Sequence, residues 1–238
     1  MPTVASVMAE LKKKGTEQTR KTYARHGMLA DKLLGVSSAD MKVIAKGIKG
    51  EQKLACELFD TGIMEAMYVA GMVADGSQMT KAQLDKWAAG AKDFPMIAEY
   101  TVPWVTVESP FSGELAKQWM QSKQERIATS GWCTYCGIVT ITADEDLDFT
   151  EIEDLLDQIV REIGGAPNRV RSTMNRMVIS VGSYVKPLTK KAIAAAKAIG
   201  PVAVDVGDTE CRVPDAIASI LKMEASGKLG KKRKTIRC

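Results

Sequence analysis

Apolar residues recur at helical spacing along almost the whole chain, and this feature constrains the fold most. They fall at positions i, i+3, i+4 and i+7, and almost no stretch alternates apolar and polar residues as a half-buried strand does. The clearest predicted helices lie at Val4 to Leu11, Met41 to Ile48, Leu84 to Ala91, Ile152 to Ile163 and Val170 to Val181. Aromatic residues, which favour strands, make up only 5% of the 238 residues. We therefore predict an all-α fold.

Short glycine or proline breaks, such as Gly50 and the Gly200-Pro201 pair, separate the predicted helices without a long linker. Such spacing fits antiparallel helix pairs stacked side by side, as in HEAT or armadillo repeats of roughly 40 to 47 residues. We predict one HEAT-like α-solenoid domain over residues 1–226. Because self-similarity at that period is weak, a globular helical bundle is the alternative. Residues 202–206 fit either a short strand or a connector.

Charge is distributed unevenly around a net charge of +4. Residues 228–238 hold six basic side chains and no acid, whereas residues 144–157 hold eight acids and no base. We predict a mobile basic tail over residues 227–238, in which Lys231, Lys232, Arg233 and Lys234 are candidate DNA contacts. A basic body with a basic tail indicates a polyanionic partner, most simply nucleic acid. The alternative is a solvated tail that only keeps the protein in solution.

Other features narrow the chemistry and the setting of the protein. No stretch approaches the roughly 18 apolar residues of a membrane span, so we expect a cytoplasmic protein, most simply a monomer. The five cysteines are odd in number and irregularly spaced, which indicates free thiols. Cys133 and Cys136 lack the further ligands that zinc needs, and His26 is the single histidine. We expect no metal and no cofactor.

Two groups of residues are candidates for function. If a helix starts near Pro103, Trp104 and Glu108 lie one turn apart, and an indole beside a carboxylate suits a cationic ligand. Further on, Arg169, Thr173 and Arg176 share one helix face that suits a nucleic-acid backbone. The alternatives are a core tryptophan with a solvated glutamate, and an ordinary solvated face.

The motif Trp104-Val-Thr-Val-Glu108 resembles the Trp-Asp-x-x-Asp signature of the AlkD-type DNA alkylation repair proteins. Three further stretches resemble that family: Leu34-Gly-Val with residues 41–48, residues 53–74, and residues 119–132. The segment from Gly207 to Cys238 is similar to a tail that recurs in one branch of the family. The resemblance implies a HEAT-like solenoid that binds duplex DNA on a basic concave surface.

In active members, the resemblance implies removal of cationic N3- or N7-alkylated purines without a metal. Trp104 would pack against the deoxyribose, and Glu108 would stabilise the sugar cation and position water. This sequence departs from the family pattern because Glu108 replaces an aspartate. The family's phosphate-binding arginine falls near Thr129, with Arg126 as a substitute one turn earlier, and its second tryptophan falls near Ile179.

We therefore expect a DNA-binding protein of alkylation repair. The enzyme hypothesis is a monofunctional glycosylase that uses Glu108 and Trp104. One alternative is a non-catalytic binder of damaged or branched DNA. The altered aspartate and the missing second tryptophan favour this alternative, whereas the retained spacing between the tryptophan and the carboxylate favours the enzyme. Another is a helical-repeat scaffold for proteins.

Overall fold

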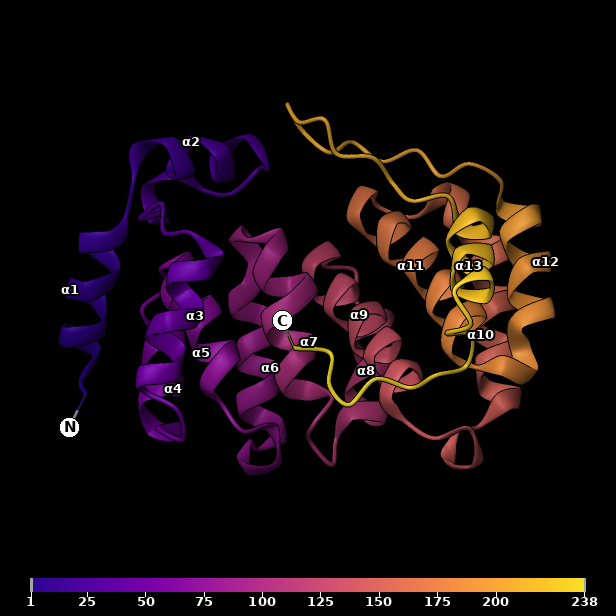
Figure 1. Ribbon diagram of the computed structural model, residues 1–238, viewed down its shortest axis with the longest axis horizontal. Helices are drawn as coiled ribbons and strands as arrows, with labels where there is room; N and C mark the ends of the chain where they lie inside the picture. Colours follow the sequence, from indigo (N-terminus) through magenta and orange to yellow (C-terminus); the bar gives the residue numbers. More distant parts are fainter. Residues whose placement is uncertain (1, 238) are drawn as a thin grey trace. The chain divides into compact units, whose positions relative to one another are not determined.

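The computed structural model describes residues 2–237, and every regular element in that range is a helix. The prediction of an all-α fold is confirmed. Residues 202–206 have no strand partner and serve as a connector. The chain divides into two compact units, whose helices are labelled in Figure 1. Unit 1 holds the chain up to Phe111 together with Val206–Glu210 and Arg237, and unit 2 holds Ser112–Asp205 and Cys211–Ile236.

Unit 1 contains seven α-helices within the described residues. They are α1 (Val4–Lys14), α2 (Glu17–Arg25), α3 (Ser38–Gly47), α4 (Gln52–Asp60), α5 (Met64–Val73), α6 (Lys81–Gly90) and α7 (Val102–Thr106). Short turns stand between them at η1 (Ala30–Lys32), η2 (Gly76–Gln78), η3 (Ala91–Asp93) and the π-helical turn η4 (Ile97–Thr101). Helices α1, α3, α5 and α7 pack in that order, while α4 packs on α5 and α6 packs on α7. This order is that of stacked helix pairs.

Helix α5 is the centre of unit 1, and almost every residue along it is buried. The composition of α5 explains this burial, because most of its own side chains are small or apolar and they point to all sides of the helix. Gly71 lets η4 approach closely, since a Cβ atom there would lie 2.5 Å from the Thr101 Cγ2 atom. Burial of α5 therefore fixes η4 and α7 in place.

Among the residues of unit 2 that the structure describes, there are six α-helices. They are α8 (Ser112–Met120), α9 (Glu125–Ile141), α10 (Phe149–Glu162), α11 (Asn168–Tyr184), α12 (Thr189–Ile199) and α13 (Ala216–Ala225), with turns η5 (Asp144–Asp146), η6 (Ile163–Gly165) and η7 (Lys186–Leu188). Helix α10 packs on α12, and α9, α11 and α13 pack in order beside them. Gly131 allows α9 to cross α8 closely, because a Cβ atom there would lie 2.5 Å from the Met120 backbone nitrogen. Unit 2 therefore also consists of stacked helix pairs.

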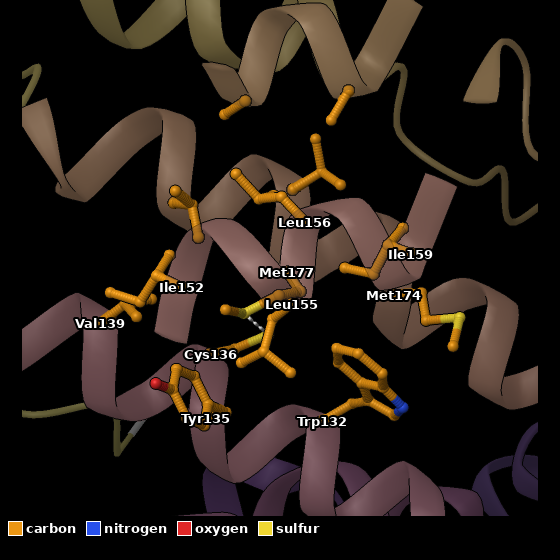
Figure 2. Close-up of a cluster of buried hydrophobic side chains, with 14 of the residues drawn as sticks. Trp132, Tyr135, Cys136, Val139, Ile152, Leu155, Leu156, Ile159, Met174 and Met177 are labelled. Atoms are coloured by element: carbon orange, nitrogen blue, oxygen red, sulfur yellow. Dashed lines mark hydrogen bonds between the residues drawn. The ribbon is translucent and has the colours of Figure 1, made fainter. Parts of the chain in front are cut away.

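Apolar stripes from α9, α10 and α11 meet in the core of unit 2. Figure 2 shows Trp132 and Cys136 of α9 facing Leu155 of α10 and Met177 of α11. Helix α10 shows how the sequence produces one of these helices. Its apolar side chains recur at helical spacing, and the Asp148 side chain caps its first turn. None of the helices in residues 2–237 is long and apolar enough to cross a membrane.

The basic tail differs from the expected mobile segment, because several hydrogen bonds hold it against unit 2. The Gly230 N–H donates to the Ser183 carbonyl oxygen at 2.8 Å, and the Arg233 N–H donates to the Thr140 carbonyl oxygen at 3.0 Å. Lys232 Nζ donates to the Val139 carbonyl oxygen at 2.9 Å and pairs with Asp144 at 2.9 Å. Residue 238 lies outside the described residues.

Candidate functional site

The segment that carries Trp104 and Glu108 is helical, although three β-branched residues lie in it. The turn η4 runs directly into α7, where Pro103 occupies the first turn and needs no N–H partner. The Val107 N–H donates to the Pro103 carbonyl oxygen at 3.0 Å, and the Glu108 N–H donates to the Val105 carbonyl oxygen at 3.3 Å. The predicted spacing of one helical turn between Trp104 and Glu108 is therefore present.

Trp104 lies in the core of unit 1 and is only 2% exposed. Its ring meets Tyr68 edge to face, with the ring centroids 5.1 Å apart, and its centroid lies 6.0 Å from that of Tyr100. Tyr100 is 38% exposed and is the member of this aromatic group that meets solvent. The indole has the surroundings of a core tryptophan, and a ligand could reach it only if this packing opened.

The Glu108 carboxylate pairs with the guanidinium group of Arg237. Arg237 Nε donates to Glu108 Oε1 at 2.8 Å, and Arg237 Nη2 donates to Glu108 Oε2. The same guanidinium donates to two carbonyl oxygens at the end of α5, from Nη1 to Gly71 at 3.0 Å and from Nη2 to Ala74 at 2.7 Å. Since carbonyls at a helix C-terminus carry partial negative charge, Arg237 satisfies them as well as the carboxylate.

The turn that follows α5 completes the surroundings of this pair. Gly76 leaves room for Glu108, because a Cβ atom at Gly76 would lie 2.9 Å from the Glu108 Cβ and 2.0 Å from the Val105 carbonyl oxygen. Hydrogen bonds from Ser77 and Gln78 hold the pKa of Asp75 below its usual range, and the positive charge of Arg237 contributes to the same effect. Arg237 therefore lies in a strongly acidic environment.

Three predicted arginines lie on two neighbouring helices of unit 2. Arg126 is the second residue of α9 and Arg169 is the second residue of α11. The Arg169 N–H donates to Glu125 Oε1 at 2.6 Å, and Arg176 Nη1 lies 3.4 Å from Cys133 Sγ. The two residues of each pair are separated by nearly the same number of positions along the chain. Helices α9 and α11 therefore run parallel, and their N-terminal ends lie side by side.

The structure buries Thr173 of the predicted arginine face, and it covers two positions that the family resemblance singled out. Thr173 is fully buried, and its Oγ1 donates to the Val170 carbonyl oxygen at 2.9 Å. Thr129 is also buried and donates in the same way to the Glu125 carbonyl oxygen at 2.7 Å. Ile179, at the position where the resemblance expects a tryptophan, is partly buried and packs against the core of unit 2. Arg126, Arg169 and Arg176 are partly exposed.

The charges of the tail and of the acidic segment are partly used within unit 2. The Lys232 ammonium group binds the Val139 carbonyl oxygen and Asp144. The side chains of the other basic tail candidates are exposed: Lys231, Arg233 and Lys234. The acidic segment is held by bases of the same unit. Lys117 pairs with Glu151 at 2.6 Å, and Lys191 pairs with Glu153 at 3.2 Å and with Asp157 at 3.1 Å. Several carboxylates of the acidic segment thus form ion pairs with lysines of the same unit.

Two cysteines have the environment of structural thiols. Cys133 and Cys136 are buried on α9 and form no disulfide with any residue that the structure describes, and burial raises the pKa of the Cys136 thiol to about 11. Cys211 is exposed and also forms no such disulfide. Among residues 2–237, no group of three His, Cys, Asp or Glu side chains lies close enough together to hold a metal ion.

The contacts of Arg237 with Glu108 and with the end of α5 were not predicted from the sequence. Arg237 lies 129 positions from Glu108 along the chain, and no periodic pattern links the two. The available signal was the resemblance of the tail to a recurring family tail, which marks the segment but not its contact. Every residue has a backbone carbonyl group, so the residue types at Gly71 and Ala74 do not indicate that their carbonyl oxygens bind Arg237.

Comparison with known proteins places the chain in a family. The family model described as "DNA alkylation repair enzyme" matches residues 7–217. An uncharacterized protein of Listeria innocua is 28% identical over 93% of this chain and 97% of its own length. An uncharacterized protein of Listeria monocytogenes is 27% identical over the same shares.

A solved structure is similar over 100% of both chains, with 35% sequence identity and a TM-score of 0.90. It is described as "A new family of proteins related to the HEAT-like repeat DNA glycosylases with affinity for branched DNA structures". This similarity confirms the predicted HEAT-like repeat fold. Because the family match spans most of the chain, the protein belongs to the DNA alkylation repair enzyme family, in its HEAT-like repeat form.

Proposed function

We propose that this protein binds DNA, with a preference for branched structures, and that it does not excise alkylated bases while Arg237 occupies Glu108. The observation that carries the binding proposal is the arrangement of Arg126, Arg169 and Arg176 on two parallel helices of unit 2. The affinity for branched DNA of the related solved protein supports the choice of ligand.

The arrangement of these arginines suits contact with phosphates, because guanidinium groups form charge-assisted hydrogen bonds with phosphate oxygens. The N-terminal ends of α9 and α11 lie side by side, but the Arg169 N–H already donates to the Glu125 carboxylate there. The guanidinium groups therefore carry the proposed contact. The exposed tail residues Lys231 and Lys234 add positive charge to the same unit. Such contacts bind DNA of any sequence, so a preference among DNA forms must come from their shape.

Three features of unit 1 are unfavourable for base excision. A carboxylate stabilises a developing sugar cation only if its charge faces that cation, and the Glu108 charge faces Arg237 instead. The Trp104 indole is buried, so it offers no open ring to a cationic base. The longer glutamate in place of the family's aspartate also displaces the carboxylate by about an ångström, which can lower a rate on the order of a hundredfold.

Binding is tested by comparing a four-way junction with a linear duplex of the same sequence at several salt concentrations. We expect tighter binding of the junction and a linear fall of log K with log salt. Removing one phosphate contact, as in R126A, R169A or R176A, should reduce the slope by about 0.9. R161A is the matched control, because Arg161 is exposed on α10, outside this group. Slopes equal to that of R161A would refute the proposed interface.

Excision is tested separately by incubating methylated duplex DNA with the protein and EDTA, and then measuring free methylated bases. We expect no release above the buffer control for the wild type. Release by the wild type that is lost in E108Q would establish the glycosylase hypothesis and refute the non-catalytic proposal. DNA binding is measured on the same samples, so that loss of binding and loss of chemistry are told apart.

A further inference from the structure

We propose that Glu108 and the end of α5 form a guanidinium-binding site, whose ligand in this chain is the side chain of Arg237. When that side chain is removed, a soluble guanidinium ion of similar size enters the site. This inference rests on the contacts within unit 1 and does not depend on DNA binding.

The acceptors of the site match the shape of a guanidinium group. Nε and Nη2 donate to the two oxygens of Glu108, so that the carboxylate is bound along one edge of the planar group. Nη1 and the other Nη2 hydrogen point to the Gly71 and Ala74 carbonyl oxygens. Four of the five N–H donors thus have acceptors. An ammonium group has three donors and no planar fork, so the arrangement favours guanidinium over lysine-like cations.

The site is built by three rigid parts of unit 1. The end of α5 supplies the two carbonyl oxygens, and the turn after α7 supplies Glu108. Gly76 allows these two parts to approach, since any side chain there would collide with the Glu108 Cβ. The Arg237 side chain is only 18% exposed, compared with 34% for that of Glu108. The guanidinium is therefore enclosed rather than lying on an open surface.

Attachment of the ligand to the chain keeps the site closed to other cations. A tethered group acts at an effective concentration of the order of millimolar, because its binding is intramolecular. A free cation, including a positively charged purine in DNA, would have to displace Arg237 before it reached Glu108. Arg237 therefore blocks access to the carboxylate that the family resemblance identifies as catalytic.

The test is chemical rescue of R237A by methylguanidinium chloride, followed as the midpoint of thermal unfolding without DNA. Tetramethylammonium chloride at the same concentration controls for ionic strength and for charge without N–H donors. R233A is the matched variant, because it removes the same charge from an exposed position of the tail. The double variant E108Q/R237A removes the carboxylate of the site.

For R237A, we expect a midpoint below that of the wild type and a saturable rise of roughly 2–4 °C with tens of millimolar methylguanidinium. The wild type, R233A and E108Q/R237A should show no such rise. If R237A gives no cooperative transition, methylguanidinium during refolding should restore one, and tetramethylammonium should not. No rescue by either readout, or equal rescue of the double variant, would overturn the proposal. Because DNA is absent, neither result affects the proposed DNA binding.

Discussion

Glu65 provides the sharpest test of how unit 1 is held together. It lies on α5, its side chain is 0% exposed, and its carboxylate faces the backbone of the turn at Leu34, Gly35 and Val36. Oε1 accepts N–H bonds from these residues at 3.0, 2.6 and 3.3 Å, and Oε2 shares the Leu34 N–H at 3.0 Å. We expect the change Glu65→Gln to destabilise the protein substantially.

The magnitude follows from the number and type of these bonds. The glutamine carbonyl oxygen can replace Oε1 and keep three acceptor contacts, but they lose the negative charge, and the amide group then faces the Leu34 N–H. A hydrogen bond to a charged group contributes about 1.5–3 kcal/mol and a neutral one about 0.5–1.5 kcal/mol, so three contacts lose about 3 kcal/mol. For a chain of this length, that corresponds to a fall of roughly 6–12 °C in the unfolding midpoint.

The assay is urea unfolding of the wild type, E65Q and E10Q, followed by circular dichroism. E10Q removes the same charge from an exposed position on α1 and should change the free energy of unfolding by less than about 0.5 kcal/mol. The urea midpoint of E65Q should fall without a change in the slope m. A free energy of unfolding for E65Q within about 1 kcal/mol of that for E10Q would show that the turn does not depend on this carboxylate.

Three further predictions test packing and reactivity. Gly76→Ala places a Cβ 2.0 Å from a carbonyl oxygen of α7, so urea unfolding should show a loss of about 1–3 kcal/mol, whereas Gly113→Ala, in open space, should show none. Trp104→Ala should lose about 3–5 kcal/mol in the same assay because the indole is buried, and an unchanged stability would contradict its place in the core. At pH 8, mass spectrometry after maleimide treatment should find Cys211 labelled and Cys136 unlabelled, since burial raises the pKa of the Cys136 thiol to about 11; rapid labelling of both would contradict the packing of α9.

The helical class and the positions of five helices could be predicted from the sequence. The stripes of α3, α6, α10 and α11 were visible because helix formation depends on residues three and four positions apart, which the sequence displays directly. The spacing of Trp104 and Glu108 was predicted for the same reason, since both lie within one local turn. The family resemblance also rested on short motifs of this kind.

Tertiary structure alone decided which of those side chains are available. Thr173 and Trp104 are buried because neighbouring helices cover the faces that they occupy, and a single helix pattern does not say which face a neighbour covers. The partner of Glu108 is Arg237 of the tail, which also donates to backbone carbonyl oxygens at the end of α5. Contacts between distant segments depend on how the whole chain packs, and backbone acceptors leave no trace in residue identity. The chemistry of the site is therefore set by packing rather than by its motif.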